Sequence, residues 1–157
     1  MYFIKHYFIT FMESLMNKKL WTGFIAVWIV YGILEWLVNA VILHSAYMSG
    51  DVAKWMRPNG EIKLWVIYVA YLFFAFFFTL IFSKGFQNKG IIEGVRYGIY
   101  VGLMVSLPAA YVSYATMPMP YTLALQWFLY GMIEMILCGI VLTFVYKPKE
   151  PKATVAT

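Results

Sequence analysis

Two carboxylates lie deep inside long apolar stretches of this 157-residue sequence, and they are the residues best suited to chemistry. Glu35 lies in the first such stretch and Glu134 in the last. Asn39 follows Glu35 by four residues and Tyr130 precedes Glu134 by four, so on a helix each polar pair shares one face. We therefore predict that Glu35, Asn39, Tyr130 and Glu134 form one polar cluster inside the folded protein.

This polar cluster has three interpretations. A carboxylate removed from water generally has a raised pKa, so it can take up and release a proton near neutral pH or hold a cation. In the simpler interpretation, neutral Glu and Asn side chains hydrogen-bond between helices and only join them. An intramembrane enzyme based on Glu35, Glu134 and Tyr130 is the third hypothesis. We expect no catalytic residues, because the sequence has no nucleophile beside a base, no HExxH motif and no phosphate-binding glycine loop.

The composition indicates the elements that must position these residues. Hydrophobic residues make up 63% of the chain and charged residues 12%, whereas a soluble domain has about 25% charged residues. Four apolar stretches are long enough to cross a hydrocarbon layer of about 30 Å as helices, at about 1.5 Å per residue. They are residues 20–43, 64–82, 91–115 and 121–146. We predict an all-α fold, an integral membrane four-helix antiparallel bundle.

The positions of Lys and Arg predict the orientation of this bundle. Nine of them fall on one side of a four-span chain, namely Lys5, Lys18, Lys19, Lys84, Lys89, Arg96, Lys147, Lys149 and Lys152. The other side holds Lys54, Arg57 and Lys63. Because loops rich in Lys and Arg stay in the cytoplasm, both termini are expected there. A multi-pass protein of a cell membrane, most simply a bacterial inner membrane, is predicted.

The chain is expected to form one domain with two short flanks. Residues 20–146 make the four-span transmembrane domain. Residues 1–19 combine aromatic side chains with lysines, which is typical of an interfacial amphipathic segment, although an extension of the first span is an alternative. Residues 147–157 are polar and contain prolines, so a disordered cytoplasmic tail is predicted.

Small residues recur at every fourth position along the third stretch. They are Gly90, Gly94, Gly98, Gly102, Ser106 and Ala110. In lipid, close van der Waals contact at small residues joins helices, so this glycine-zipper pattern predicts a packing face. Its partner is either another helix of this chain or another subunit. Pro108 lies in the same stretch and is expected to kink it.

The remaining polar residues predict no cofactor. Cys138 is the only cysteine, and His6 and His44 lie on opposite sides of the predicted membrane. Haem ligation by His44 is conceivable, but neither a metal nor a cofactor is expected. Glu93 and Arg96 are three residues apart, so we predict an interfacial ion pair; the minority view is a site for an anionic headgroup.

The second half of the chain resembles small bacterial four-span membrane proteins of the kind grouped as domains of unknown function. The resembling segments are Lys84-Gly85-Phe86, Gly94 to Gly102 with Arg96-Tyr97-Gly98, the turn Met117-Pro118-Met119-Pro120, and Gly131 to Glu134 ahead of Val145-Tyr146. The resemblance implies a four-helix membrane fold with a polar Glu in its last span. It implies no reaction.

Two functions are compatible with these features. The leading hypothesis is a non-enzymatic membrane protein that packs against itself or within a larger membrane complex, because the small-residue face is long and little of the chain lies outside the membrane. The alternative is a small oligomeric proton-coupled or cation transporter that uses Glu35 and Glu134. The expected partners are the lipid bilayer and a second copy or another membrane subunit. Nucleic-acid binding is not expected, since the net charge of +5 is explained by topology and by contact with anionic lipid.

Overall fold

The structure, a computed structural model, describes residues 17–147, and in that part of the chain it contains helices and loops but no strand. The four long helices are α2 (Lys18–Trp36), which continues into the π-helix η1 (Leu37–Ile42), α5 (Leu64–Gly85), α6 (Ile91–Thr116) and α7 (Tyr121–Tyr146). The predicted all-α fold is confirmed. Lys18 and Lys19 form the first turn of α2, while the rest of the predicted interfacial segment up to residue 16 and the tail from residue 148 lie outside the described residues.

Each long helix is long and apolar enough to cross a membrane. The shortest of the four has 22 residues, which span about 33 Å at about 1.5 Å per residue. That length exceeds a hydrocarbon layer of about 30 Å. The chain therefore has the helices of a multi-pass membrane protein.

Local sequence explains where these helices begin and end. The Asn17 side chain accepts the backbone N–H of Lys19 at 2.9 Å and so caps α2. Gly90 precedes α6 with a φ of 71°, in the left-handed region that favours glycine. The segment between α6 and α7 contains Pro118 and Pro120, which have no N–H to continue a helix. Pro108 lies inside α6, which runs without interruption from Ile91 to Thr116.

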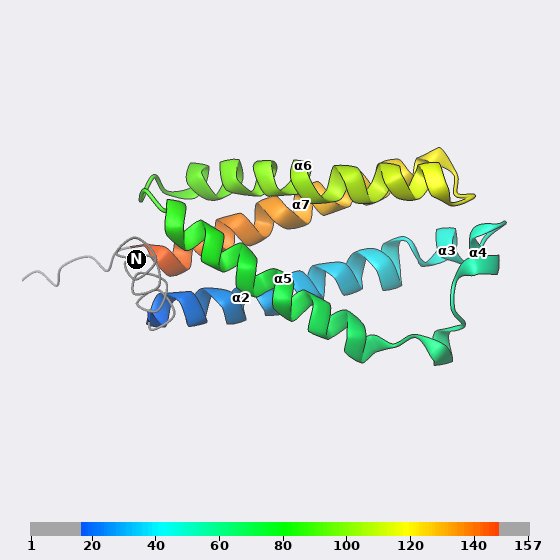
Figure 1. Cartoon of the computed structure of the whole chain (residues 1–157), viewed down its shortest axis with the longest axis horizontal. Coiled ribbons are helices and arrows are strands. Elements are labelled where there is room, and N and C mark those ends of the chain that lie inside the picture. Colours follow the sequence, from blue (N-terminus) through cyan, green and yellow to red (C-terminus); the bar gives the residue numbers. More distant parts are fainter. Residues whose placement is uncertain (1–16, 148–157) are drawn as a thin grey trace, which may run out of the picture.

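Successive long helices run in opposite directions, so the molecule has two distinct ends (Figure 1). The basic end holds the starts of α2 and α6 and the ends of α5 and α7. The loop end holds α3 (His44–Tyr47), α4 (Val52–Trp55) and the 3-10 turn η2 (Asn59–Glu61). α5 crosses the other helices obliquely, and its start at the loop end lies well away from α6 in Figure 1.

The segment between α2 and α5 is more than a connection. Tyr47 of α3 and Val52 of α4 are buried in a hydrophobic cluster with Leu43, and this cluster includes Leu123 and Ala124 from the first turn of α7. The short helices therefore pack against α7 at the loop end. They hold this end of α2 beside α7.

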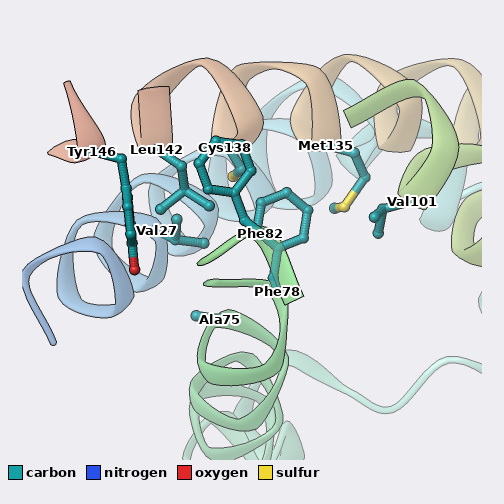
Figure 2. Packing of buried hydrophobic residues seen from close by; sticks show 9 residues of the cluster. All are labelled: Val27, Ala75, Phe78, Phe82, Val101, Met135, Cys138, Leu142 and Tyr146. Atoms are coloured by element: carbon teal, nitrogen blue, oxygen red, sulfur yellow. The ribbon is translucent and has the colours of Figure 1, made fainter. Parts of the chain in front are cut away.

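α7 is the central helix, because it packs against α2, α5 and α6, while α5 packs mainly against α2. The main hydrophobic core draws on all four long helices (Figure 2). Its buried members are Val27, Ala75, Phe78, Phe82, Val101, Met135, Cys138, Leu142 and Tyr146. The predicted small-residue face belongs to α6, and α6 packs mainly against this central helix α7.

The small residues of α6 face α7 within the same chain. A Cβ atom added to Gly94 would overlap the carbonyl oxygen of Gly139, and one added to Gly139 would overlap the carbonyl oxygen of Gly94. A Cβ on Gly98 would lie 2.5 Å from the carbonyl oxygen of Met135. The two helix backbones therefore touch, and only glycine fits at these positions.

One end of the predicted packing face contacts α7, and the other end does not. Gly102, Ser106 and Ala110 are buried with Gly94 and Gly98 along α6. A Cβ on Gly131 of α7 would lie 2.5 Å from the Ser106 hydroxyl, so this contact also belongs to α7. Gly90 does not belong to the face, because it precedes the helix and a Cβ there would have nothing within 4 Å. Its glycine serves the turn conformation.

Candidate functional site

Glu35 is held by three hydrogen-bond donors. Tyr31, one turn earlier on α2, donates its hydroxyl to Oε1 at 2.6 Å. Oε2 accepts the Asn39 side-chain amide at 2.7 Å and the hydroxyl of Tyr71, from α5, at 3.1 Å. All three neighbours are donors, so both oxygens of this carboxyl group have hydrogen-bond partners.

The hydrogen bonds continue from Glu35 toward the loop end. Oδ1 of Asn39 accepts the Tyr47 hydroxyl at 2.6 Å. That hydroxyl in turn accepts the indole N–H of Trp127, from α7, at 2.8 Å. Burial raises the pKa of Tyr47 to about 12, so its hydroxyl keeps its proton near neutral pH and donates it to Asn39. The chain of bonds joins α2, α3 and α7.

A π-helical turn places Asn39 in this network. In η1 the backbone widens, and the N–H of Leu43 bonds to the carbonyl of Val38, five residues earlier, at 2.8 Å. The Asn39 amide bonds both the carboxylate of Glu35 and its backbone carbonyl, the latter at 3.1 Å. Such π-turns are rare and often occur at functional sites. A regular helix was expected here.

Glu134 is more buried than Glu35 and less well paired. Only 4% of its surface is exposed, in the middle of α7. Its Oε1 atom is buried and has no hydrogen-bond partner among the described residues. An unsatisfied buried carboxylate is costly, by about 1 to 3 kcal/mol or more, unless a proton or a cation neutralises it.

Both carboxylates line one pocket of about 280 Å³ between α2, α6 and α7. Its walls are Tyr31, Glu35, Val38 and Asn39 of α2 and η1, Val105, Ser106, Ala109 and Ala110 of α6, and Trp127, Tyr130, Gly131, Glu134 and Met135 of α7. None of these lining residues is Lys, Arg or His. The walls therefore hold two carboxyl groups and no basic side chain that could pair with them.

The structure thus brings Glu35, Asn39, Tyr130 and Glu134 to one pocket. The sequence argument missed the donors that hold Glu35. Tyr31 could have been found, because it lies four residues before Glu35 on the same helix face. Tyr71 and Tyr47 could not, because they come from elements whose placement depends on the fold.

No known protein family, curated protein or solved structure matches the chain. The pocket and its residues therefore carry the functional inference.

α5 closes the basic end of the molecule but leaves the pocket open at the side. Near the basic end, the Tyr97 hydroxyl of α6 donates to the Phe78 carbonyl of α5 at 2.6 Å. Toward the loop end α5 diverges from α6 (Figure 1), and no residue that lines the pocket comes from α5. Val105 of the pocket wall is 39% exposed. The pocket is therefore bounded by three helices.

Glu93 has a different partner from the one we predicted. Its carboxylate accepts the backbone N–H of Gln87 at 2.5 Å and that of Lys89 at 2.8 Å, and the side chain is buried. The turn at Gly90 folds these two amides back over the first turn of α6. Within residues 17–147 Glu93 makes no ion pair with Arg96, because the nearer backbone amides occupy both of its oxygens.

The described residues contain no group of three His, Cys, Asp or Glu side chains that could hold a metal ion. His44 is exposed at the loop end, and Cys138 is buried in the core beside Leu142. The chemistry available at the pocket is therefore that of two carboxylates among tyrosines, a tryptophan and an amide.

Proposed function

We propose that this protein is a small membrane transporter that loads a proton or a monovalent cation at the pocket between α2, α6 and α7. The observation that carries the proposal is the buried, unpartnered Oε1 of Glu134, which faces the same pocket as Glu35. The proposal continues the second of the two functions predicted from the sequence.

The two carboxylates have different roles in this proposal. Glu35 has both oxygens hydrogen-bonded by Tyr31, Tyr71 and Asn39, so it is held in place beside the site and does not itself exchange a ligand. Glu134 has an oxygen without a protein donor, and a proton or a bound cation can satisfy it. In this proposal the oxygen binds either the proton or the cation, but not both at once. The movement of the proton is therefore coupled to the movement of the cation.

The distribution of charge supports an orientation for the transporter. Lys18, Lys84, Arg96 and Lys147 all lie at the basic end, where α2 and α6 begin and α5 and α7 end. We propose that this end faces the cytoplasm of a bacterial cell, with both termini inside, because short segments rich in Lys and Arg are retained there. The pocket then lies in the outer half of the membrane.

A role as an accessory subunit remains a prediction, but it has lost the feature that supported it. The small-residue face of α6 is covered by α7 of the same chain, so that face is not available to another protein. We propose that the transporter works as a homo-oligomer, since four helices enclose no complete pathway on their own. Cross-linking in membranes followed by denaturing gel electrophoresis tests this: only a monomer band at all cross-linker concentrations would contradict it.

Infrared spectroscopy tests whether Glu134 loads a proton. The purified protein in lipid vesicles is titrated with acid, and the C=O band of protonated carboxyl groups is followed in wild type and in Glu134→Gln. We expect one component of the band to vanish in the variant. Glu61→Gln is the matched control, because Glu61 is an exposed carboxylate at the loop end; it should leave the component that vanishes in Glu134→Gln in place.

Vesicle flux completes the test. With a gradient of a monovalent cation imposed across the membrane, wild-type vesicles should change their internal pH faster than empty ones, and Glu134→Gln vesicles should behave as empty ones. An unchanged band together with unchanged flux in Glu134→Gln would overturn the proposal.

A further inference from the structure

We infer that the ligand which exchanges with the proton on Glu134 is a small organic ammonium ion with an apolar body, not a metal ion. The inference rests on the proposed function and names the class of cation. It follows from three features of the pocket. They are the small number of free oxygen ligands, the separation of its polar residues from its apolar residues, and its position at the surface of the bundle.

The pocket offers too few free oxygens for a dehydrated divalent metal ion. Hard cations such as Ca²⁺ take six to eight oxygen ligands, and Mg²⁺ requires an octahedral set. Both oxygens of Glu35 are already occupied by side-chain donors, and Oδ1 of Asn39 is occupied by Tyr47. Glu134 contributes its own carboxylate, whose Oε1 is buried without a partner in the described part of the chain, and Ser106 and Tyr130 add only two hydroxyl groups. An ammonium group has only three N–H donors and needs few acceptors.

The remaining walls suit a carbon skeleton. The α6 wall consists of Val105, Ala109 and Ala110 beside Ser106, and Val38 and Met135 add apolar surface from the other helices. Tyr31, Trp127 and Tyr130 also line the pocket, and aromatic rings attract organic cations through their π-faces. The pocket is thus anionic on the side of Glu35 and Glu134 and apolar on the side of α6.

Size and access limit the ligand further. A volume of about 280 Å³ lies just below the lower end of about 300 Å³ for ordinary small-molecule pockets. The ligand is therefore a single-ring or short-chain amine. The pocket has no residue of α5 in its walls, and Val105 of its α6 wall is 39% exposed on the outer side of the bundle. That side of a membrane-spanning helix bundle meets lipid, so an amine that dissolves in the bilayer can reach Glu134 directly.

The exchange is balanced in atoms and charge. The protonated carboxyl of Glu134 and one ammonium ion become a carboxylate–ammonium pair and one free proton. The titratable groups around Glu134 are Tyr31 and Glu35 of α2, Tyr71 of α5 acting through Glu35, and Tyr130 and Cys138 of α7. The α6 wall adds Ser106, which does not titrate, so no cationic group of the pocket walls opposes the ligand.

Benzylammonium is a suitable probe, with neutral benzyl alcohol and Na⁺ as comparisons. Binding to the full-length protein in mild detergent is measured by isothermal titration calorimetry in two buffers of different ionisation enthalpy, which reports the protons released. We expect saturable binding of benzylammonium alone, release of one proton per cation near neutral pH, and affinity that falls as the pH is lowered. Saturable binding of Na⁺, or equal affinity for benzyl alcohol, would overturn the inference.

Two variants separate this inference from the proposed function. Glu134→Gln should weaken benzylammonium binding at least tenfold. Ala109→Leu adds a side chain to the apolar wall at an exposed position of α6, so it should weaken the amine at least tenfold while the infrared band of Glu134 persists. Ala115→Leu, exposed on the same helix but outside the pocket, is the matched control and should bind like wild type.

The outcomes are distinguishable. If the Glu134 band and the proton flux persist but benzylammonium does not bind, the ammonium inference fails and the proposed function stands. If Ala109→Leu binds the amine like wild type, the pocket is not its site. If the band, the flux and the binding are all unaffected by Glu134→Gln, both proposals fail together.

Discussion

Replacing Gly98 by alanine should separate the two most closely packed helices. The new Cβ would lie 2.5 Å from the Met135 carbonyl oxygen and would overlap the Cα atom of Ile136. Both are backbone atoms of α7, so no side chain can turn aside to make room. Ordinary contacts begin at 3.4 Å, so α6 must move away by about 1 Å, a gap that already forfeits about a quarter to a half of the local dispersion energy.

The magnitude follows from two opposing effects. Overpacking of a core costs about 1 to 3 kcal/mol, and immovable backbone atoms place Gly98→Ala near the upper limit. Alanine recovers up to about 1 kcal/mol through its better helix propensity. We therefore expect a net loss of about 2 kcal/mol, which lowers the melting temperature by roughly 4 to 8 °C for a chain of this size.

Gly32→Ala is the matched control in the same assay. Gly32 also lies within a long helix, but a Cβ there would meet only the Tyr68 ring, at 3.8 Å. The control should be neutral or slightly stabilised, by up to about 1 kcal/mol. Thermal unfolding in mild detergent, followed by circular dichroism, gives both values. Equal melting temperatures for Gly98→Ala and Gly32→Ala would refute the close contact between α6 and α7.

Three further predictions concern the network and the turn before α6. Glu35→Gln should destabilise the protein by about 1 to 3 kcal/mol in the same thermal assay, because an amide group cannot accept hydrogen bonds from all three donors around Glu35. Glu134→Gln should leave stability within about 1 kcal/mol of wild type, because the Oε1 atom of Glu134 has no partner to lose. Tyr47→Phe leaves a buried amide oxygen and an indole N–H without their partner, so it should cost about 1 to 3 kcal/mol; no loss would contradict the network. Gly90→Ala should cost about 1 to 2 kcal/mol at its φ of 71°, and an unchanged melting temperature would show that the turn adopts another conformation.

The helices could be predicted from the sequence, because each is a long apolar stretch bounded by polar residues or proline. Their order in space could not be. The pattern of small residues on α6 was visible because it repeats at one spacing, whereas its counterpart on α7 is only Gly131 and Gly139, eight residues apart. Two glycines among large residues carry little weight in a sequence, and α7 was therefore not recognised as the central helix.

The candidate site could be predicted in part from the sequence, for a similar reason. Glu35 with Asn39, and Tyr130 with Glu134, are local pairs whose shared face follows from helix geometry. The π-turn at residues 37–42 follows no local motif that we recognised, and its Val38 lies in the cluster in which α3 and α4 pack against α7. Glu93 illustrates the opposite error: a neighbour in sequence, Arg96, was preferred to backbone amides that only the folded turn brings close.

One stripe of small residues on α6 explains both the packing of the protein and the existence of its pocket. Near the basic end, Gly94 and Gly98 let α6 touch the backbone of α7, and α5 closes the bundle beside them through Tyr97 and Phe78. Toward the loop end the stripe continues as Ser106 and Ala110, but there α5 has diverged. Side chains this small cannot fill the space in front of Glu134. Larger residues would fill that space, so the same pattern that joins two helices also leaves a pocket beside Glu134.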